Sequence, residues 1–234
     1  MRIKYRNLEK IFVIFKSFLP VKTQLVKTLY SNKILVISPH IDDDIIGAGG
    51  SLIRHTSLGK KSSVVYVTIG LEERINEAEA INRIVGYDKQ FFLGYKPDHI
   101  KKYNYFKEEL VKILYNELPD AILIPFLVDN HKDHIIVNKL FLEVVADNKI
   151  EVDIFCYEVW TPLFPNFVVD ISNVIDIKKR CIEIYKSQLI THNYVNQTLS
   201  LNSFRGKVYD VDYAEAFFKT DVSYYLYLWR KIYG

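Results

Sequence analysis

A histidine and three consecutive carboxylates directly follow an apolar segment near residue 40. The segment 34–37 (Ile-Leu-Val-Ile) is mostly β-branched and predicts a buried strand, which Pro39 ends because proline cannot donate to a sheet. His40 and the three aspartates 42–44 come next. Adjacent carboxylates repel one another unless a cation compensates them, and imidazole and carboxylate are ordinary ligands of catalytic divalent metals. The turn therefore predicts a metal site.

A second group of the same kind, His131-Lys132-Asp133-His134, follows the apolar segment 121–124 and precedes a predicted helix. If both apolar segments are strands of one parallel sheet, their carboxyl ends lie at the same edge. The two groups would then face each other across the end of the sheet.

The residues of the two groups can be assigned roles in a catalytic metal site. His40, Asp43 and His134 would give three ligands with a position left for water, the pattern of a catalytic zinc site. Asp42 beside that water would be the general base. His131 would donate to the developing oxyanion, and Asp133 would orient a neighbouring imidazole.

Short apolar segments alternate with longer amphipathic ones along the whole chain. The predicted strands are 34–37, 62–69, 90–93, 121–124 and 153–157, and the predicted helices are 45–56, 72–85, 103–117, 135–146, 176–187 and 213–232. This alternation predicts an α/β fold, a Rossmann-like three-layer sandwich with a mostly parallel sheet. One domain over residues 31–234 accounts for the pattern. The glycines in 47–50 lack dinucleotide-loop spacing and predict close packing of the first helix.

The two motifs also resemble those of a known family. Pro39-His40-Ile41-Asp42-Asp43-Asp44 is similar to the Pro-His-Pro-Asp-Asp-Glu signature of the PIG-L (LmbE-like) zinc-dependent de-N-acetylase superfamily, and 131–134 is similar to its second motif, His-Pro-Asp-His. The similarity continues over roughly residues 33–218. It includes these further segments: Arg74-x-x-Glu77, Leu93-Gly94-Tyr95, Tyr157-Glu158-Val159-Trp160, Lys178, 185–188 and 213–217.

The resemblance implies His40, Asp43 and His134 as ligands of zinc, whose place other divalent transition metals could take. It implies Asp42 as the base that later protonates the leaving amine, and protonated His131 as the partner of the carbonyl oxygen.

The resemblance further implies Arg74 as a substrate-positioning residue. Tyr157 and Trp160, at the end of the fifth predicted strand, are expected to contact substrate, although Trp160 could instead pack in the core. Asp44 replaces the glutamate of the signature and is one methylene shorter, so its role stays open.

By this resemblance the chain is expected to be a zinc-dependent deacetylase. It would hydrolyse the N-acetyl group of an N-acetylglucosamine-type sugar, free, lipid-linked or part of a glycoconjugate, and release acetate. Two alternatives stay open at this point: a zinc amidase acting on a non-sugar acetamide, and a catalytically idle sugar-binding module.

The composition and charge of the chain argue against disordered and nucleic-acid-binding proteins. The chain of 234 residues is 49% hydrophobic and 25% charged, which excludes dominant disorder. A net charge of +3 without a basic–aromatic cluster argues against a nucleic-acid partner. Cys156 and Cys181 have no Cys-x-x-Cys partner, and we expect two buried thiols in a reducing, cytoplasmic compartment. The oligomeric state cannot be deduced from these features.

Residues 1–30 precede the first predicted strand and are expected to form an N-terminal helical extension. Their apolar centre, 11–15, is flanked by basic residues and is too short to span a bilayer. Two interpretations stay open: a peripheral anchor on the inner face of the membrane, or a helix packed on the domain.

Overall fold

The computed structural model describes residues 23–97, 105–189 and 193–234. Its strands are β1 (Gln24–Val26), β2 (Lys33–Ser38), β3 (Lys61–Thr68), β4 (Lys89–Tyr95), β5 (Ala121–Pro125), β6 (Asp153–Tyr157), β7 (Phe167–Asp170) and β8 (Ala214–Asp221). Its helices are α2 (Asp43–Ser57), α3 (Glu73–Val85), α4 (Phe106–Glu117), α5 (Lys132–Asp147), α6 (Ile175–Ile184), α7 (Lys186–Leu189), α8 (Tyr194–Val208) and α9 (Val222–Tyr233), with a short 3₁₀ turn, η2 (Ser172–Val174).

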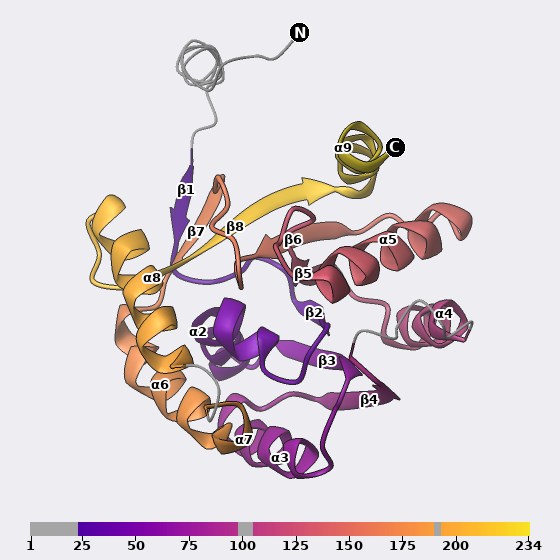
Figure 1. The fold of residues 1–234 in the computed structure, drawn as a ribbon. Coiled ribbons are helices and arrows are strands. Elements are labelled where there is room, and N and C mark those ends of the chain that lie inside the picture. Colours follow the sequence, from indigo (N-terminus) through magenta and orange to yellow (C-terminus); the bar gives the residue numbers. More distant parts are fainter. Residues whose placement is uncertain (1–22, 98–104, 190–192) are drawn as a thin grey trace, which may run out of the picture.

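All eight strands belong to one sheet in the order β1-β7-β8-β6-β5-β2-β3-β4 (Figure 1). Every pairing is parallel except those of β8, which runs antiparallel to both β6 and β7. The α/β fold with a mostly parallel sheet is thus confirmed.

Helices cover both faces of the sheet and create two cores. Successive residues of β2 alternate between them: Ile34 and Val36 pack into the core under α2, α3 and α6, whereas Leu35 and Ile37 pack into the core under α4, α5 and α9. A strand that is buried on both faces has a continuous run of apolar residues, and β2 has such a run.

The order of the strands places the two motifs side by side. From β2 the chain moves outward through β3 and β4, and it then returns to β5 on the other side of β2. The neighbours β2 and β5 are therefore a topological switch point, where ligands bind in sheets of this kind. The turn after β2 carries His40 and Asp42–Asp44, and the loop after β5 carries His131 and His134.

Several sequence-based boundaries differ from the structure. The segment 213–232, which we predicted as one helix, is the strand β8 followed by α9. Its helix-prone Ala-Glu-Ala-Phe stretch pairs between two other strands, so tertiary context overrides local propensity. Residues 23–30, which we expected in a helical extension, contain β1, and β1 joins the sheet beside β7. Residues 1–22 lie outside the described residues.

The helix α8 was not predicted at all, because its buried side chains are mostly polar. They include Thr198, Asn202 and Arg205. A hydrophobic repeat therefore does not mark this helix. Cys156 and Cys181 are buried and unpaired, as expected.

Candidate metal centre and its cleft

A cleft with a cavity volume of about 280 Å³ opens at the switch point. Its lining comes from the turn after β2, from α2 and α3, from the loops after β4, β5 and β6, and from α7 and α8. The lining residues are His40, Asp42, Asp43, Ile46, Arg74, Pro97, His131, Val159, Trp160, Gln188 and Tyr194. Most of the residues predicted for the site from the sequence are therefore among its walls. The exceptions are Asp133, His134 and Tyr157, which lie deeper and are completely buried.

Three atoms of the predicted ligand set converge at the floor of this cleft. Asp43 Oδ2 lies 3.0 Å from His40 Nδ1 and 3.0 Å from His134 Nε2, and the two nitrogens are 3.2 Å apart. A tetrahedral zinc ion with bonds of about 2.0–2.1 Å separates its ligand atoms by about 3.3–3.4 Å. The triangle of donor atoms is therefore close to the size that fits such an ion.

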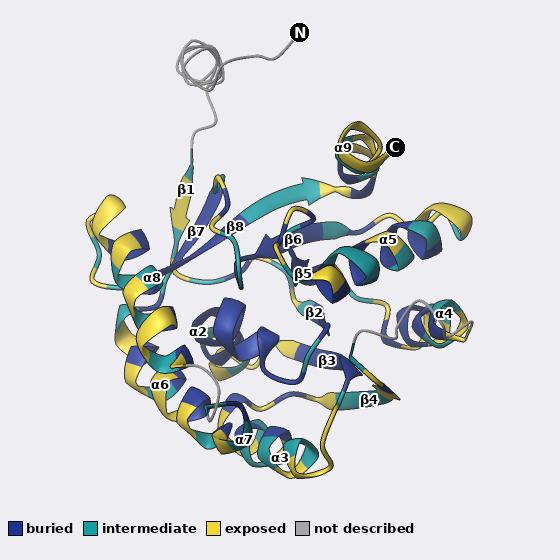
Figure 2. Cartoon of the chain, viewed as in Figure 1, coloured by how far each residue is buried: buried dark blue, intermediate teal, exposed yellow. Residues whose placement is uncertain are grey.

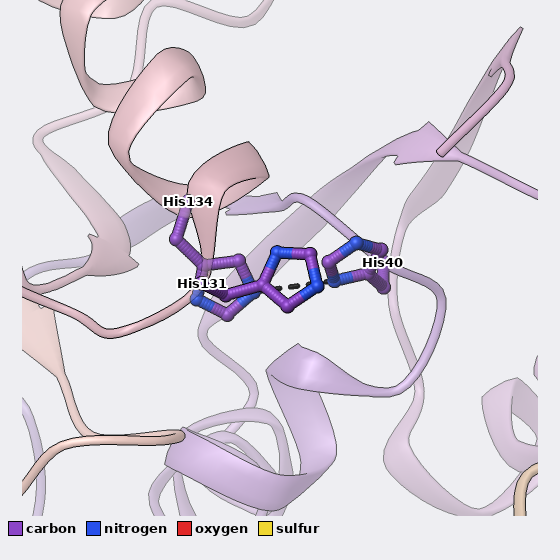
Figure 3. A group of neighbouring side chains, drawn as sticks. All are labelled: His40, His131 and His134. Atoms are coloured by element: carbon purple, nitrogen blue, oxygen red, sulfur yellow. Dashed lines mark hydrogen bonds between the residues drawn. The ribbon is translucent and has the colours of Figure 1, made fainter. Parts of the chain in front are cut away.

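The third histidine of the two motifs lies next to this triangle. His40, His131 and His134 each offer a ring nitrogen, and these nitrogens lie within 4.8 Å of one another (Figure 3). The rings of His40 and His131 meet edge to face, with centroids 4.5 Å apart. The structure thus offers two overlapping donor sets, one with Asp43 and one with His131.

Asp43 and the two histidines beside it shift one another's pKa. Despite burial, its contacts with His134 and His40 hold the pKa of this carboxyl well below its ordinary value. Burial would lower the pKa of the two imidazoles, but Asp43 and the other nearby carboxylates together outweigh it and raise the pKa of His40 to about 10 and that of His134 to about 9. Since metal-binding histidine must be neutral, a cation that enters this triangle has to displace protons.

A second carboxylate lies behind each imidazole. Asp133 Oδ2 lies 3.3 Å from His40 Nε2, and Asp129 Oδ1 lies 3.2 Å from His134 Nδ1. Such partners fix the orientation of a ligating histidine and raise its basicity. Sequence analysis anticipated an orienting function for Asp133 but missed Asp129, because an aspartate in a loop has no spacing signal that separates it from a turn residue.

His131 is the N-cap of α5. Its Nδ1 accepts a hydrogen bond from the backbone N–H of Asp133 at 3.2 Å. Burial and the neighbouring His40 and His134 lower the pKa of His131. The lowered pKa favours a neutral ring, with Nδ1 as acceptor and Nε2–H as donor, over the protonated form that we expected.

Asp42 is 5% exposed and borders the cleft. Burial, with the adjacent charge of Asp43, raises the pKa of Asp42 to about 7. A carboxyl group with a pKa near the working pH can both accept and return a proton.

The predicted substrate contacts divide between cleft and core. Arg74 borders the cleft, and its buried Nε has no hydrogen-bond partner within the described residues. Trp160 borders the cleft as well, edge to face with Tyr194 at 5.9 Å between ring centroids. Tyr157 does not: it is fully buried and its hydroxyl donates to the carbonyl of Ile37 at 3.0 Å. The expectation for Tyr157 is corrected to a core residue.

Asp44 points away from the metal ligands. Its Oδ2 accepts hydrogen bonds from the hydroxyls of Tyr66 at 3.0 Å and Tyr87 at 2.6 Å, in the core between α2 and the sheet. Its carboxylate therefore anchors α2 and is not a partner of the histidines.

Comparison with known proteins bears on this geometry. Residues 35–145, which include both motifs, match the family model described as PIG-L, GlcNAc-PI de-N-acetylase. A diacetylchitobiose deacetylase of Thermococcus kodakarensis is 27% identical over 188 residues, which cover 67% of this chain and 70% of that protein.

Two solved structures share the fold. A conserved protein of Thermus thermophilus superposes with a TM-score of 0.71 at 28% identity, over 79% of this chain and 92% of the other. An N,N′-diacetylchitobiose deacetylase of Pyrococcus horikoshii superposes with a TM-score of 0.71 at 23% identity, over 96% of each chain. The resemblance predicted from the motifs is confirmed: over the segment that holds both motifs the chain is similar to the PIG-L (LmbE-like) superfamily, and its relatives include sugar deacetylases.

Proposed function

We propose that this protein is a zinc-dependent deacetylase that hydrolyses the N-acetyl group of an N-acetylglucosamine-type sugar and releases acetate. The observation that carries the proposal is the triangle of His40 Nδ1, Asp43 Oδ2 and His134 Nε2, with sides of 3.0–3.2 Å, on the floor of the cleft. The family match and the deacetylase relative support hydrolysis of an amide.

These three residues would hold the metal. Two neutral imidazoles and one carboxylate suit zinc and leave one position for water or substrate, although other divalent transition metals accept the same donors. When bound there, the ion would polarise the acetyl carbonyl and lower the pKa of water.

The remaining residues of the cleft would handle protons and orientation. Asp42 would take a proton from the attacking water and then return it to the leaving nitrogen, so that the amine departs neutral. His131 Nε2–H would donate to the carbonyl oxygen as negative charge develops on it. Asp133 would hold His40 in the orientation that this chemistry needs.

Arg74 and Trp160 would bind the sugar. The guanidinium of Arg74 could bind a hydroxyl of the substrate, and the ring of Trp160 offers an apolar face for a pyranose. The name of the Thermococcus relative supports an N-acetylated amino sugar as substrate.

The test is an acetate-release screen with metal content measured on the same sample. Zinc-loaded wild-type protein should release acetate from N-acetylglucosamine or N,N′-diacetylchitobiose. Asp42→Asn should retain zinc but lose about 10²–10⁴-fold in kcat, the typical contribution of a general acid–base residue. Full turnover by Asp42→Asn would contradict the assigned base.

The same screen separates the alternatives. Acetate release from other acetamides but from no amino sugar would favour a non-sugar amidase. Protein that binds no zinc and stays inactive after zinc addition would favour a sugar-binding module.

Membrane contact through residues 1–30 stays a proposal. No helix in the described ranges combines the length and the apolarity that crossing a bilayer requires. If the basic and apolar segment 1–22 binds a membrane surface, the full chain should co-sediment with anionic liposomes more than a chain that starts at Thr23, just before β1, does. Equal partitioning would contradict membrane contact.

A further inference from the structure

Lys178, on α6, and Glu215, on β8, form an ion pair whose side chains are both completely buried. Lys178 Nζ lies 2.6 Å from Glu215 Oε1. Removing such charges from water costs several kcal/mol per ion, and apolar side chains of similar size are often at least as stabilising. Stability alone is therefore a weak explanation for the pair.

The contacts of the pair are directed at the backbone of α2. Besides Glu215, Lys178 Nζ donates to Asn202 Oδ1 and to the carbonyl of Ile46, both at 2.9 Å. Glu215 accepts from the backbone amide of Gly50 through Oε1 at 2.8 Å and from that of Ser51 through Oε2 at 2.7 Å.

These contacts fall in the middle of a helix. In a regular α-helix the amide of Gly50 would donate to the carbonyl of Ile46. Here Lys178 binds that carbonyl and Glu215 binds that amide, so the ion pair contacts both the acceptor and the donor of one step in the hydrogen-bond ladder of α2. The helix lies between the sheet and the layer of α6 and α8 and is buried along nearly its whole length (Figure 2).

The part of α2 before these contacts carries Asp43 of the candidate metal centre. The amide of Ile46 donates to the carbonyl of Asp42 at 3.0 Å, and Asp43 is the first residue of the helix. Two successive hydrogen bonds, on either side of Ile46, therefore connect Lys178 to Asp42. The side chain of Ile46 also borders the cleft.

We propose that the buried ion pair holds the middle of α2 in place and thereby sets where Asp42 and Asp43 lie relative to the two histidines. Lys178 and Glu215 do not line the cleft, so they are positioning residues and not catalytic ones. The catalytic consequence of this proposal rests on the proposed function, whereas its effect on the metal centre can be measured without any turnover.

The experiment uses full-length protein with cobalt(II) as the probe, because its visible absorption reports the geometry of its ligands. The double variant Lys178→Met/Glu215→Leu replaces the pair by apolar side chains of similar size, and Glu215→Gln is the milder change. Glu117→Gln is the matched control. Glu117 is 2% exposed and contacts Lys89 and Ser63, at the opposite edge of the sheet.

Without the pair, the backbone of α2 loses its contacts at Ile46, Gly50 and Ser51, and its first turn can move. Both variants should bind cobalt at least about tenfold more weakly than wild type and with an altered visible spectrum, while Glu117→Gln should match wild type. If acetate release is detected, kcat should fall in both variants with KM within a few-fold of wild type.

A folded double variant with wild-type cobalt affinity and spectrum would overturn the proposal. If the double variant does not fold, the same criterion applies to Glu215→Gln. Because the cobalt readout needs no substrate, a wild-type protein that releases no acetate would refute the proposed function and leave this comparison decisive.

Discussion

Each of the two histidines that meet at Asp43 has a second carboxylate on its far side. Asp133 lies behind His40, and Asp129 lies behind His134. Asp129 also accepts from the backbone amides of His131, at 2.9 Å, and Trp160, at 3.0 Å. One loop carboxylate thus connects a ligand, a proposed oxyanion donor and a wall of the cleft.

This arrangement predicts that Asp129→Asn weakens metal binding. The asparagine keeps an oxygen for the turn but cannot offer a carboxylate to His134, so zinc affinity should fall about 10–100-fold, as is typical for such partners. Competition titration with a chromogenic chelator measures the affinity.

The control for this prediction is Asp170→Asn. Asp170 Oδ1 accepts from the amide of Ser172 at 2.9 Å, the same local contact that Asp129 makes with His131, but its further partner is the hydroxyl of Ser172, whereas that of Asp129 is His134. Asp170→Asn should leave zinc affinity unchanged, and an equal loss in both variants would show that the turn and not the carboxylate matters.

At the scale of single residues, sequence reasoning found the groups with distinctive spacing. His40, Asp43 and His134 were predicted from two short motifs, and the structure brings their donor atoms together. From the sequence we could not identify Asp129, whose importance depends on the loop conformation. We also misplaced Tyr157, because a strand-end aromatic can point either to the cleft or to the core.

At the scale of elements, α2 depends on how closely it approaches its neighbours. A Cβ on Gly47 would lie 2.2 Å from Tyr157 Cδ2 and 2.8 Å from the carbonyl oxygen of Glu158. The glycine therefore allows the helix to rest on the end of β6, as the glycine-rich sequence 47–50 suggested.

We predict that Gly47→Ala destabilises the protein by about 1–3 kcal/mol through overpacking, although alanine is intrinsically the better helix former by up to about 1 kcal/mol. Chemical denaturation measures the free energy of unfolding. Gly49→Ala is the comparison: its Cβ would meet a side-chain atom of Ile45 at 3.2 Å and no backbone, so the loss should be smaller. A Gly47→Ala variant as stable as wild type would show that α2 can shift away from β6 at no cost.

Elements with regular apolar patterns were predictable, and those defined by tertiary contacts were not. The strands β2 to β6 have continuous apolar runs and were found within about two residues. The helix α8 buries polar residues such as Asn202, and β8 is made a strand by β6 and β7 on either side. These two missed elements also supply Asn202 and Glu215, the contacts that hold α2.

At the scale of the whole molecule, the topology assembles the site. Residues 40–43 and 131–134 are about 90 positions apart in the chain, and the reversal of strand order between β2 and β5 places them at one edge. The alternation of strands and helices predicted the class of fold and the edge of the sheet at which the two motifs meet. The antiparallel β8 and the pairing of β1 with β7 did not, because both depend on long-range contacts.

The most direct test of the account is a zinc-soaked crystal analysed by anomalous scattering on both sides of the zinc edge. The account predicts one peak within about 2.0–2.2 Å of His40 Nδ1, Asp43 Oδ2 and His134 Nε2. A peak bonded to His131 in place of Asp43, or no peak at the end of β2 and β5, would contradict it.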